Sequence, residues 1–175
     1  MGGQTAGPES GTPHTTASQT ATTPQATTPD ATTPQAATPR TATPHTIVTA
    51  PGLAPPVGFA HAVVCAPGRT VLLGGQTAQR PDGSIGGATV AEQFAIAVAN
   101  VRTALEAAGG APGDLAALTV YTTDVPAYRA ALREIGVAYR GCMGRHYPAM
   151  ALLGVSALFD EEALVELVGV AVLPE

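Results

Sequence analysis

The chain has 175 residues, a formal net charge of −5 at pH 7, and 45 % hydrophobic against 12 % charged residues. This length fits one domain, or a small domain with an appendage. The basic residues are all Arg and form no basic run, which argues against nucleic acid as a partner, because phosphate contacts supply most of such affinity. No apolar run approaches the roughly 20 residues of a membrane span, and no leader pattern opens the chain. We therefore expect a cytoplasmic protein without a membrane partner.

Residues 1–46 are predicted to be a disordered tail. They are mostly Thr, Pro, Ala and Gln, and contain no Val, Leu, Ile, Phe, Tyr or Cys. Such a segment cannot bury enough apolar surface to offset the entropy lost on ordering. Proline at every fifth residue interrupts helices and sheet ladders. These prolines are Pro24, Pro29, Pro34, Pro39 and Pro44. The tail is either a spacer or modified stalk, or a neutral low-complexity extension, and residues 47–175 form the predicted domain.

The first part of this domain is rich in β-prone residues. A short strand is predicted at Ile47–Ala50. Two longer β-prone runs, Phe59–Cys65 and Arg69–Leu73, flank the turn signal Ala66-Pro67-Gly68 and together predict a hairpin. A glycine-rich loop follows over residues 77–88.

A first helix is predicted after this loop. Thr89 and Glu92 have the spacing of a capping box, in which each side chain bonds the backbone N–H of the other. Gly109-Gly110 is a typical helix end. Between them, apolar residues recur every three or four positions and predict one buried face. They are Phe94, Val98, Val101, Leu105 and Ala108.

The second part is predicted to hold three strands and one helix. Asp124 is a suitable N-cap for a helix with the apolar face Tyr128, Leu132, Ile135 and Tyr139. The strands are Leu115–Tyr121, Ala149–Leu158 and Ala163–Leu173, with a loop over residues 141–148. The order β-β-α-β-α-β-β predicts an α+β fold in which two helices cover one face of a mixed sheet. The other face is left bare, which predicts an oligomer.

Six segments, in this order and at this spacing, resemble the RidA (YjgF) family. They are Gly58-Phe59-Ala60-His61-Ala62-Val63; Leu73-Gly74-Gly75-Gln76; Gln93 with Asn100, Val101 and residues 105–109; Tyr121-Thr122-Thr123-Asp124 with Tyr128; Tyr147-Pro148-Ala149; and residues 164–167 with Ala171-Val172. The resemblance covers about residues 55–173. It implies a chorismate-mutase-like fold and a homotrimer with small-molecule clefts between subunits. It also implies hydrolysis of reactive enamines or imines to ketones and ammonia, and no cofactor is expected.

The chain departs from this family where the ligand binds. Family deaminases have an Arg directly after Pro-Ala, whose guanidinium grips a carboxylate through two parallel hydrogen bonds. Met150 occupies that position here, and a thioether cannot do this. The other binding positions implied by the resemblance are Phe59, Gly75, Leu132, Ala149 and Leu152. Phe59 replaces a Tyr, Leu132 replaces a polar residue, and Leu152 replaces a small polar residue or Cys. Gly75 and Ala149 match the family pattern, whereas Gly74 stands in place of Ser.

One acidic residue keeps its place in the pattern. Glu166 aligns with the last-strand Glu that orients or activates the attacking water in the family. If it faces a cleft lined by Leu132, Met150 and Leu152, it could act as a general acid or base; otherwise it is an ordinary strand residue in solvent. Arg145 is a candidate substitute for the missing Arg, or a solvated loop residue.

Other catalytic arrangements have little support in the sequence. Cys142 and His146 have the spacing of a metal pair, but two ligands do not make a site, so no metal is expected. No base is placed beside Cys142 to make it a nucleophile. Two functions stay open: a deaminase for a small, more apolar substrate, or a trimeric ligand-binding module that lost deaminase activity with the Arg. The acidic charge argues against RNA cleavage.

Overall fold

The computed structural model describes residues 45–175, so all but the last two residues of the predicted tail lie outside the described part. In chain order the elements are β1 (Thr46–Val48), β2 (Ala62–Val64), β3 (Arg69–Gln76), α1 (Val90–Ala107), the 3-10 turn η1 (Pro112–Asp114), β4 (Leu115–Thr122), α2 (Val125–Ala130), α3 (Leu132–Met143), β5 (Ala149–Gly154) and β6 (Val165–Leu173).

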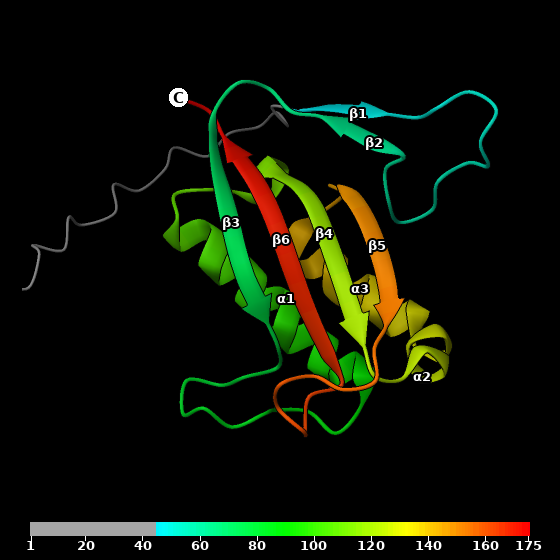
Figure 1. Ribbon diagram of the computed structural model, residues 1–175, viewed down its shortest axis with the longest axis vertical. Helices are drawn as coiled ribbons and strands as arrows, with labels where there is room; N and C mark the ends of the chain where they lie inside the picture. Colours follow the sequence, from blue (N-terminus) through cyan, green and yellow to red (C-terminus); the bar gives the residue numbers. More distant parts are fainter. Residues whose placement is uncertain (1–44) are drawn as a thin grey trace, which may run out of the picture. The chain divides into compact units, whose positions relative to one another are not determined.

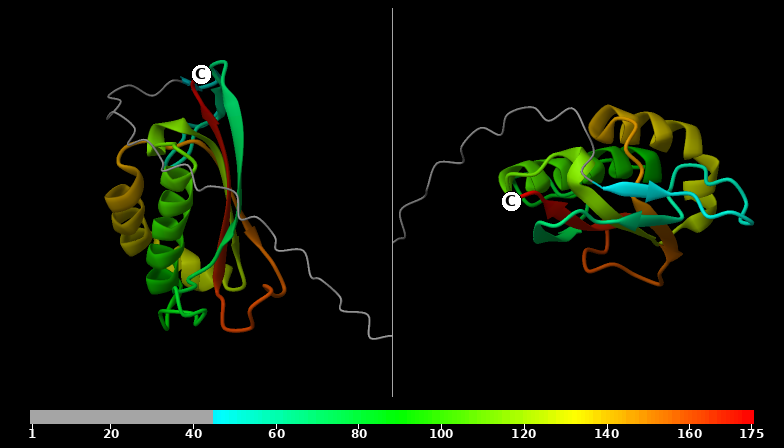
Figure 2. Two further views of the ribbon diagram at one scale, coloured as in Figure 1. Left: turned by 90° about the vertical axis from the view of Figure 1, so that its left-hand side faces the viewer. Right: turned by 90° about the horizontal axis from the view of Figure 1, so that it is seen from above.

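Four strands form one mixed sheet in the order β3-β6-β4-β5 (Figure 1). β6 runs antiparallel to both of its neighbours, and β4 and β5 are parallel. The helices all lie on one side of this sheet (Figure 2). This arrangement confirms the predicted α+β class, with both helical segments on one face.

The core fills the space between the sheet and α1. The helix buries the apolar stripe that its spacing predicts, apart from Ala108, which is the exposed C-cap. Gly169 in the middle of β6 belongs to this packing, because a Cβ there would lie 3.0 Å from the Leu73 side chain and 3.1 Å from that of Leu115. These two leucines fill the space, which explains a glycine at a buried strand position.

Both ends of α1 follow the sequence prediction. The Glu92 N–H donates to the Thr89 hydroxyl at 3.2 Å, and the Glu92 carboxylate accepts from the Ala88 and Thr89 N–H groups. At the other end Gly109 takes a φ of +84°, and the Gly110 N–H donates to the Leu105 carbonyl at 2.9 Å. The positive φ closes the helix at little steric cost only because the residue is glycine.

The predicted hairpin of residues 59–65 with residues 69–73 is wrong. β2 pairs antiparallel with β1, and β3 pairs with β6. Gly68 explains the choice, because a Cβ there would overlap the backbone carbonyl of Leu173 in β6. The turn at Gly68 therefore lies directly against the end of β6. As a result β3 pairs with β6, about 100 residues away in sequence, and not with the adjacent β2. Strand propensity carries no information about such a partner.

The predicted second helix is two helices. Asp124 caps α2 as expected, with the Ala127 N–H donating to its carboxylate at 2.8 Å. The helix is then interrupted at Ala131, whose φ of −100° and ψ of 14° separate α2 from α3. Neither Gly nor Pro marks this break, so the sequence offers no signal for it. The apolar face nevertheless continues across it, and Tyr128, Ile135 and Tyr139 are all buried.

Several predicted boundaries also shift. β1 starts and ends earlier than predicted, at Thr46 and Val48, and β3 runs on to Gln76. α3 continues to Met143. The predicted strand 149–158 ends at Gly154, and the last strand begins at Val165 rather than Ala163.

The outer face of the sheet carries no helix. Along β6 the odd-numbered residues are buried against the helices, whereas the even-numbered ones are partly exposed. Leu72 of β3 is 77 % exposed on this outer face, and Leu153 of β5 is exposed there as well. In the part of the chain described here, no helix is long and apolar enough to cross a membrane.

His45 fixes the start of the folded part. It is buried, its Nε2 lies 3.0 Å from the Asp114 carbonyl oxygen, and its Nδ1 accepts the Ala66 N–H at 3.3 Å. Thr46 then pairs with Val64 in the β1–β2 ribbon. Two residues that the sequence assigns to the tail therefore make contacts within the fold.

We expect a chain that starts at His45 to be more stable than one that starts at Ile47. The shorter chain loses two hydrogen bonds of a buried imidazole, at a cost of roughly 1–2 kcal/mol. Thermal unfolding of the two truncated chains measures the difference, and equal melting temperatures would contradict the role given to His45. The chain from His45 should match the full-length protein.

Replacing Phe94 by Ala should lower the free energy of unfolding by about 3–5 kcal/mol, because it opens a cavity in the core. Phe94 is 1 % exposed, whereas Phe159 is 99 % exposed. The matched control Phe159→Ala should change stability by less than about 0.5 kcal/mol. Urea unfolding of both variants measures this contrast, and similar losses would disprove the assigned core.

Candidate functional site

A pocket of about 340 Å³ lies between the α2–α3 segment and β5. Leu132 and Met150, two of the predicted binding residues, both line it. The remaining lining residues are Val57, Gly58, Phe94, Tyr128, Ile135, Gly136, Tyr139, Arg140 and Tyr147. The pocket is apolar and aromatic, with one cationic residue, and its size is that of a small-molecule site.

Strand register places Met150 in this pocket. Met150 pairs with Leu118 of β4, which is fully buried on the helix side of the sheet. Paired residues of neighbouring strands share a face, so Met150 points toward the helices and packs against the core. Leu152 pairs with Val120 on the same face. It is exposed farther along the edge strand and is not part of the pocket wall.

The loop between β1 and β2 closes one side of the pocket. The Ala60 N–H donates to the Pro148 carbonyl at 2.9 Å, and Ala60 forms a parallel bridge with Ala149. Ala149, one of the predicted binding residues, therefore holds this loop against β5. This attachment brings Val57 and Gly58 to the pocket wall.

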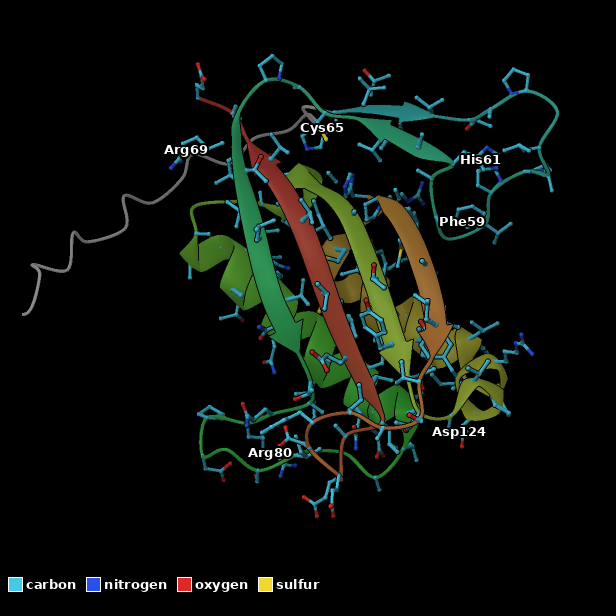
Figure 3. The ribbon with its side chains drawn as sticks, in the orientation of Figure 1. Phe59, His61, Cys65, Arg69, Arg80 and Asp124 are labelled. Atoms are coloured by element: carbon cyan, nitrogen blue, oxygen red, sulfur yellow. The ribbon has the colours of Figure 1, made fainter. Side chains whose placement is uncertain are left out.

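Phe59 and His61 lie together on this loop (Figure 3). Their rings meet edge to face with centroids 5.8 Å apart, and Phe59 itself does not line the pocket. His61 accepts the Ala50 N–H at Nδ1, and its Nε2 lies 3.0 Å from the Ala54 carbonyl oxygen. Both ring nitrogens thereby hold the loop in shape.

Tyrosines form much of the pocket floor. Tyr139 and Tyr147 stack with ring centroids 5.0 Å apart, and the Tyr139 hydroxyl donates to the His146 carbonyl at 2.8 Å. Tyr128 meets Phe94 edge to face at 5.9 Å. Burial raises the pKa of Tyr128 to about 12, and it raises the pKa of Tyr139 as well. Both phenols are protonated at neutral pH, and the Tyr139 hydroxyl uses its proton in the bond to the His146 carbonyl.

Glu166 lies on the other face of the sheet. It pairs with Tyr121 of β4 on the outer face, opposite to the side of Met150. Its carboxylate lies directly over Gly75 of β3, where an added Cβ would overlap it. Glu166 and Gly75, two predicted site residues, are thus in contact. Within one chain they are separated from the Leu132–Met150 pocket by the sheet itself.

The other sequence candidates lie outside this pocket. Arg145 is an exposed residue of the loop after α3 and does not line it. His146 Nε2 lies 2.6 Å from the Leu115 carbonyl oxygen, which ties the same loop to β4. Burial raises the pKa of the Cys142 thiol and so disfavours the thiolate. Among residues 45–175, no three His, Cys, Asp or Glu side chains are grouped as metal ligands.

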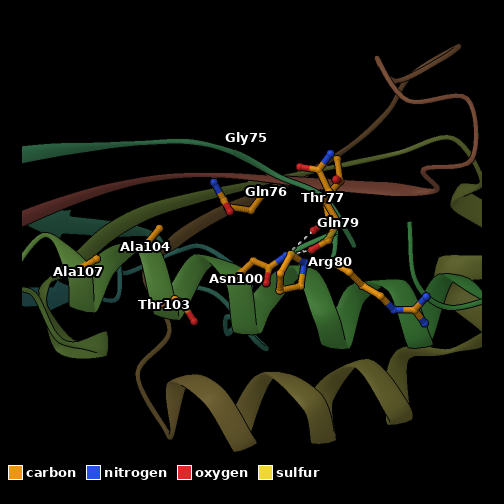
Figure 4. A pocket seen from close by; sticks show the side chains of 10 residues that line it. Gly75, Gln76, Thr77, Gln79, Arg80, Asn100, Thr103, Ala104 and Ala107 are labelled. Carbon is orange, nitrogen blue, oxygen red and sulfur yellow. Dashed lines mark hydrogen bonds between the residues drawn. The ribbon is translucent and has the colours of Figure 1, made fainter. Parts of the chain in front are cut away.

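A second, more polar depression of about 390 Å³ lies beside the end of β3 (Figure 4). Asn100 of α1 reaches across it and donates to the Thr77 and Gln79 carbonyls at 3.0 and 2.9 Å. The Gln76 amide is likewise engaged with the Gly74 carbonyl. The two Asn100 bonds hold the loop after β3, so we assign the depression a structural role.

Arg140 is the pocket residue that sequence reasoning missed. It is an exposed residue of α3 that lines the same pocket as Leu132 and Met150. A signal was present, because Leu132, Gly136 and Arg140 follow one another at i, i+4 and i+8. Residues at this spacing share one helix face, so a residue on the face of Leu132 was a candidate neighbour of Met150.

The family model for endoribonuclease L-PSP matches residues 49–173 of this chain. The YyfB protein of Yersinia pestis, described as a Rid-family protein of unknown function, is 32 % identical. Its structure superposes with a TM-score of 0.66, covering 74 % of this chain and 99 % of that chain. The chain therefore belongs to the endoribonuclease L-PSP family, which is the RidA (YjgF) family, and the resemblance seen in the sequence is confirmed.

Two further solved structures share this fold. A candidate endoribonuclease L-PSP from Entamoeba histolytica is 26 % identical, with a TM-score of 0.53 over 75 % of this chain and 96 % of that one. RidA from an Antarctic Psychrobacter species, at 23 % identity and a TM-score of 0.53, shares the fold over 73 % of this chain and 98 % of that one. A search of curated proteins found no match.

Replacing Gly75 by Ala should displace the Glu166 carboxylate, because the added Cβ needs the space that the carboxylate fills. The adjacent Gly74 has no atom within 4 Å of an added Cβ, so Gly74→Ala is the matched control. Crystal structures of both variants measure the effect. An unmoved Glu166 in the Gly75→Ala protein would contradict the contact described here.

Proposed function

We propose that this protein is a divergent enamine or imine deaminase that acts on a small, largely apolar substrate in clefts between subunits. The observation that carries the proposal is the contact of Glu166 with Gly75. The carboxylate has a space that exists only because residue 75 lacks a side chain. Such a fitted position distinguishes Glu166 from a strand residue that merely points into solvent.

The position of Glu166 also supports a trimer. A single chain cannot bring Glu166 and the Leu132–Met150 pocket to one ligand, because they lie on opposite faces of the sheet. A second copy packed against the outer face can present its pocket to the first copy's Glu166. Exposed Leu72 and Leu153 on that face are suited to burial in such an interface. A closed ring of three copies satisfies every pair in the same way.

Hydrolysis of an imine needs one general acid–base group from the protein, and we assign this role to Glu166. Water adds to the C=N carbon of an imine while the Glu166 carboxylate accepts a proton from that water. The protonated carboxyl returns this proton to nitrogen, which gives a carbinolamine. The carboxylate then accepts the hydroxyl proton and passes it to the amino nitrogen, so that ammonia leaves as the C=O bond forms. Each turnover converts one imine and one water into one ketone and one ammonia, and it regenerates the carboxylate.

The pocket walls indicate which imines fit. Met150 replaces the Arg of the family pattern, and Leu132 replaces a polar residue, so the wall favours a branched or aromatic side chain over a methyl group. We therefore expect the imine derived from leucine to be hydrolysed faster than 2-iminopropanoate. RNA cleavage, to which the family model's description refers, is not proposed, because the chain is acidic.

The alternative is a ligand-binding trimer without turnover. The presence of Met150 in place of the family Arg favours this alternative, because it removes the side chain that binds the substrate carboxylate in the family deaminases. The two functions differ in a single measurement. Saturable binding of apolar oxo acids, without any acceleration of imine hydrolysis, would establish the binding module.

Glu166→Gln should lower the rate of imine hydrolysis above the spontaneous reaction by about 100-fold or more, because a positioned acid–base group contributes at least this much. The imine of leucine, generated in the assay by an amino-acid oxidase, is the substrate, and released ammonia is measured. Exposed Glu161, in the loop before β6, supplies the control Glu161→Gln.

Sedimentation of both glutamate variants checks that the trimer persists. Full activity in a trimeric Glu166→Gln protein would remove Glu166 from its assigned role. An inactive wild-type trimer would refute the deaminase proposal itself.

A further inference from the structure

Arg140 is the one cationic side chain in the wall of the Leu132–Met150 pocket. Its side chain is exposed, and the other lining side chains are aliphatic, aromatic or, in Met150, a thioether. Among residues 45–175, no carboxylate lies within 4 Å of its guanidinium; the ion pair found there joins Arg102 to Glu106. A cation next to an apolar cavity, without an acidic partner in the described part, is suited to an anionic ligand.

Gly136 gives the Arg140 side chain its position. A Cβ at residue 136 would lie 3.2 Å from Arg140 Nη1, so the guanidinium folds back one helical turn over the bare glycine. A glycine inside a helix is less favourable than alanine by roughly 1 kcal/mol. At Gly136 its effect is to leave room for the guanidinium beside the pocket.

Tyr128 offers a second donor from the same cavity. Its side chain is 7 % exposed and lines the pocket. The Tyr139 hydroxyl is engaged with the His146 carbonyl, whereas no hydrogen bond of the described residues involves the Tyr128 hydroxyl. A protonated phenol without a protein acceptor can donate to a ligand oxygen.

We propose that Arg140 binds the carboxylate of the ligand and that the ligand is a small monocarboxylate with a branched aliphatic or aromatic body. A guanidinium can hold a carboxylate through two parallel hydrogen bonds, and the body packs on Met150 and Leu132. This inference rests on the proposed function and deepens it by naming the residue that binds the substrate carboxylate. Carboxylate recognition then comes from a helix instead of the strand position that Met150 occupies.

Binding of 4-methyl-2-oxopentanoate and of its methyl ester to the full-length protein tests the proposal without any turnover. The two probes share one carbon skeleton and differ in the negative charge. Calorimetry or NMR titration should show that the wild-type protein binds the acid about tenfold or more tightly than the ester, as expected for hydrogen bonds to a charged group.

Arg140→Gln should reduce this preference to about one. Arg133→Gln is the matched control, because Arg133 is exposed on the same helix but lines the groove between α1 and α3. It should keep the wild-type preference. A preference that survives Arg140→Gln, or a wild-type protein that binds neither probe at millimolar concentration, would overturn the proposal.

Gly136→Ala gives a second test that does not depend on removing the charge. The added methyl group crowds Arg140 Nη1, so binding of the acid should weaken, whereas the melting temperature should rise because alanine favours the helix. A variant that is more stable and binds the acid as tightly as the wild-type protein would contradict the role given to Gly136 and Arg140.

Failure of this inference and failure of the proposed function can be told apart. If the protein hydrolyses imines but Arg140→Gln leaves the preference for the acid intact, the deaminase stands and Arg140 is not its carboxylate group. If the acid binds through Arg140 but no imine is hydrolysed, the anion site stands and the deaminase proposal fails.

Discussion

The strand β6 organises this molecule, because it lies between β3 and β4 and its side chains alternate between two environments. Leu167 and Ala171 point into the core beneath α1, whereas Glu166 points to the outer face. The period of two along a strand makes this division unavoidable. Leu167, which packs in the core, and Glu166, the candidate catalytic residue, are therefore adjacent in sequence but lie on opposite faces of the sheet.

The same geometry divides the candidate site into two halves. The edge strand β5 and the α2–α3 segment form a pocket on the helix side, and Glu166 with Gly75 forms a second half on the outer face. In this chain the pocket half is apolar at Met150 and Leu132, and the second half is the contact of Glu166 with Gly75.

Much of the fold could be predicted from local sequence. The capping box at Thr89, the glycines after α1 and the spacing of the buried stripe each fix a local structure through short-range hydrogen bonds or periodicity. The prediction failed where a strand pairs with a partner distant in sequence. β3 was expected to pair with β2, but it pairs with β6. It also failed at Ala131, where the helix breaks without a residue that favours a break.

The sequence by itself determined the family, the class of fold and the identities of Met150 and Glu166 within its pattern, because motif order and spacing are properties of the chain. Only the tertiary structure decided that these two residues lie on opposite faces of the sheet and that Arg140 lies beside Met150. Strand register and the packing of α3 on the sheet set those positions. Both depend on contacts between segments distant in sequence. Helix periodicity places Arg140 on the face of Leu132, but no local pattern places that face against β5.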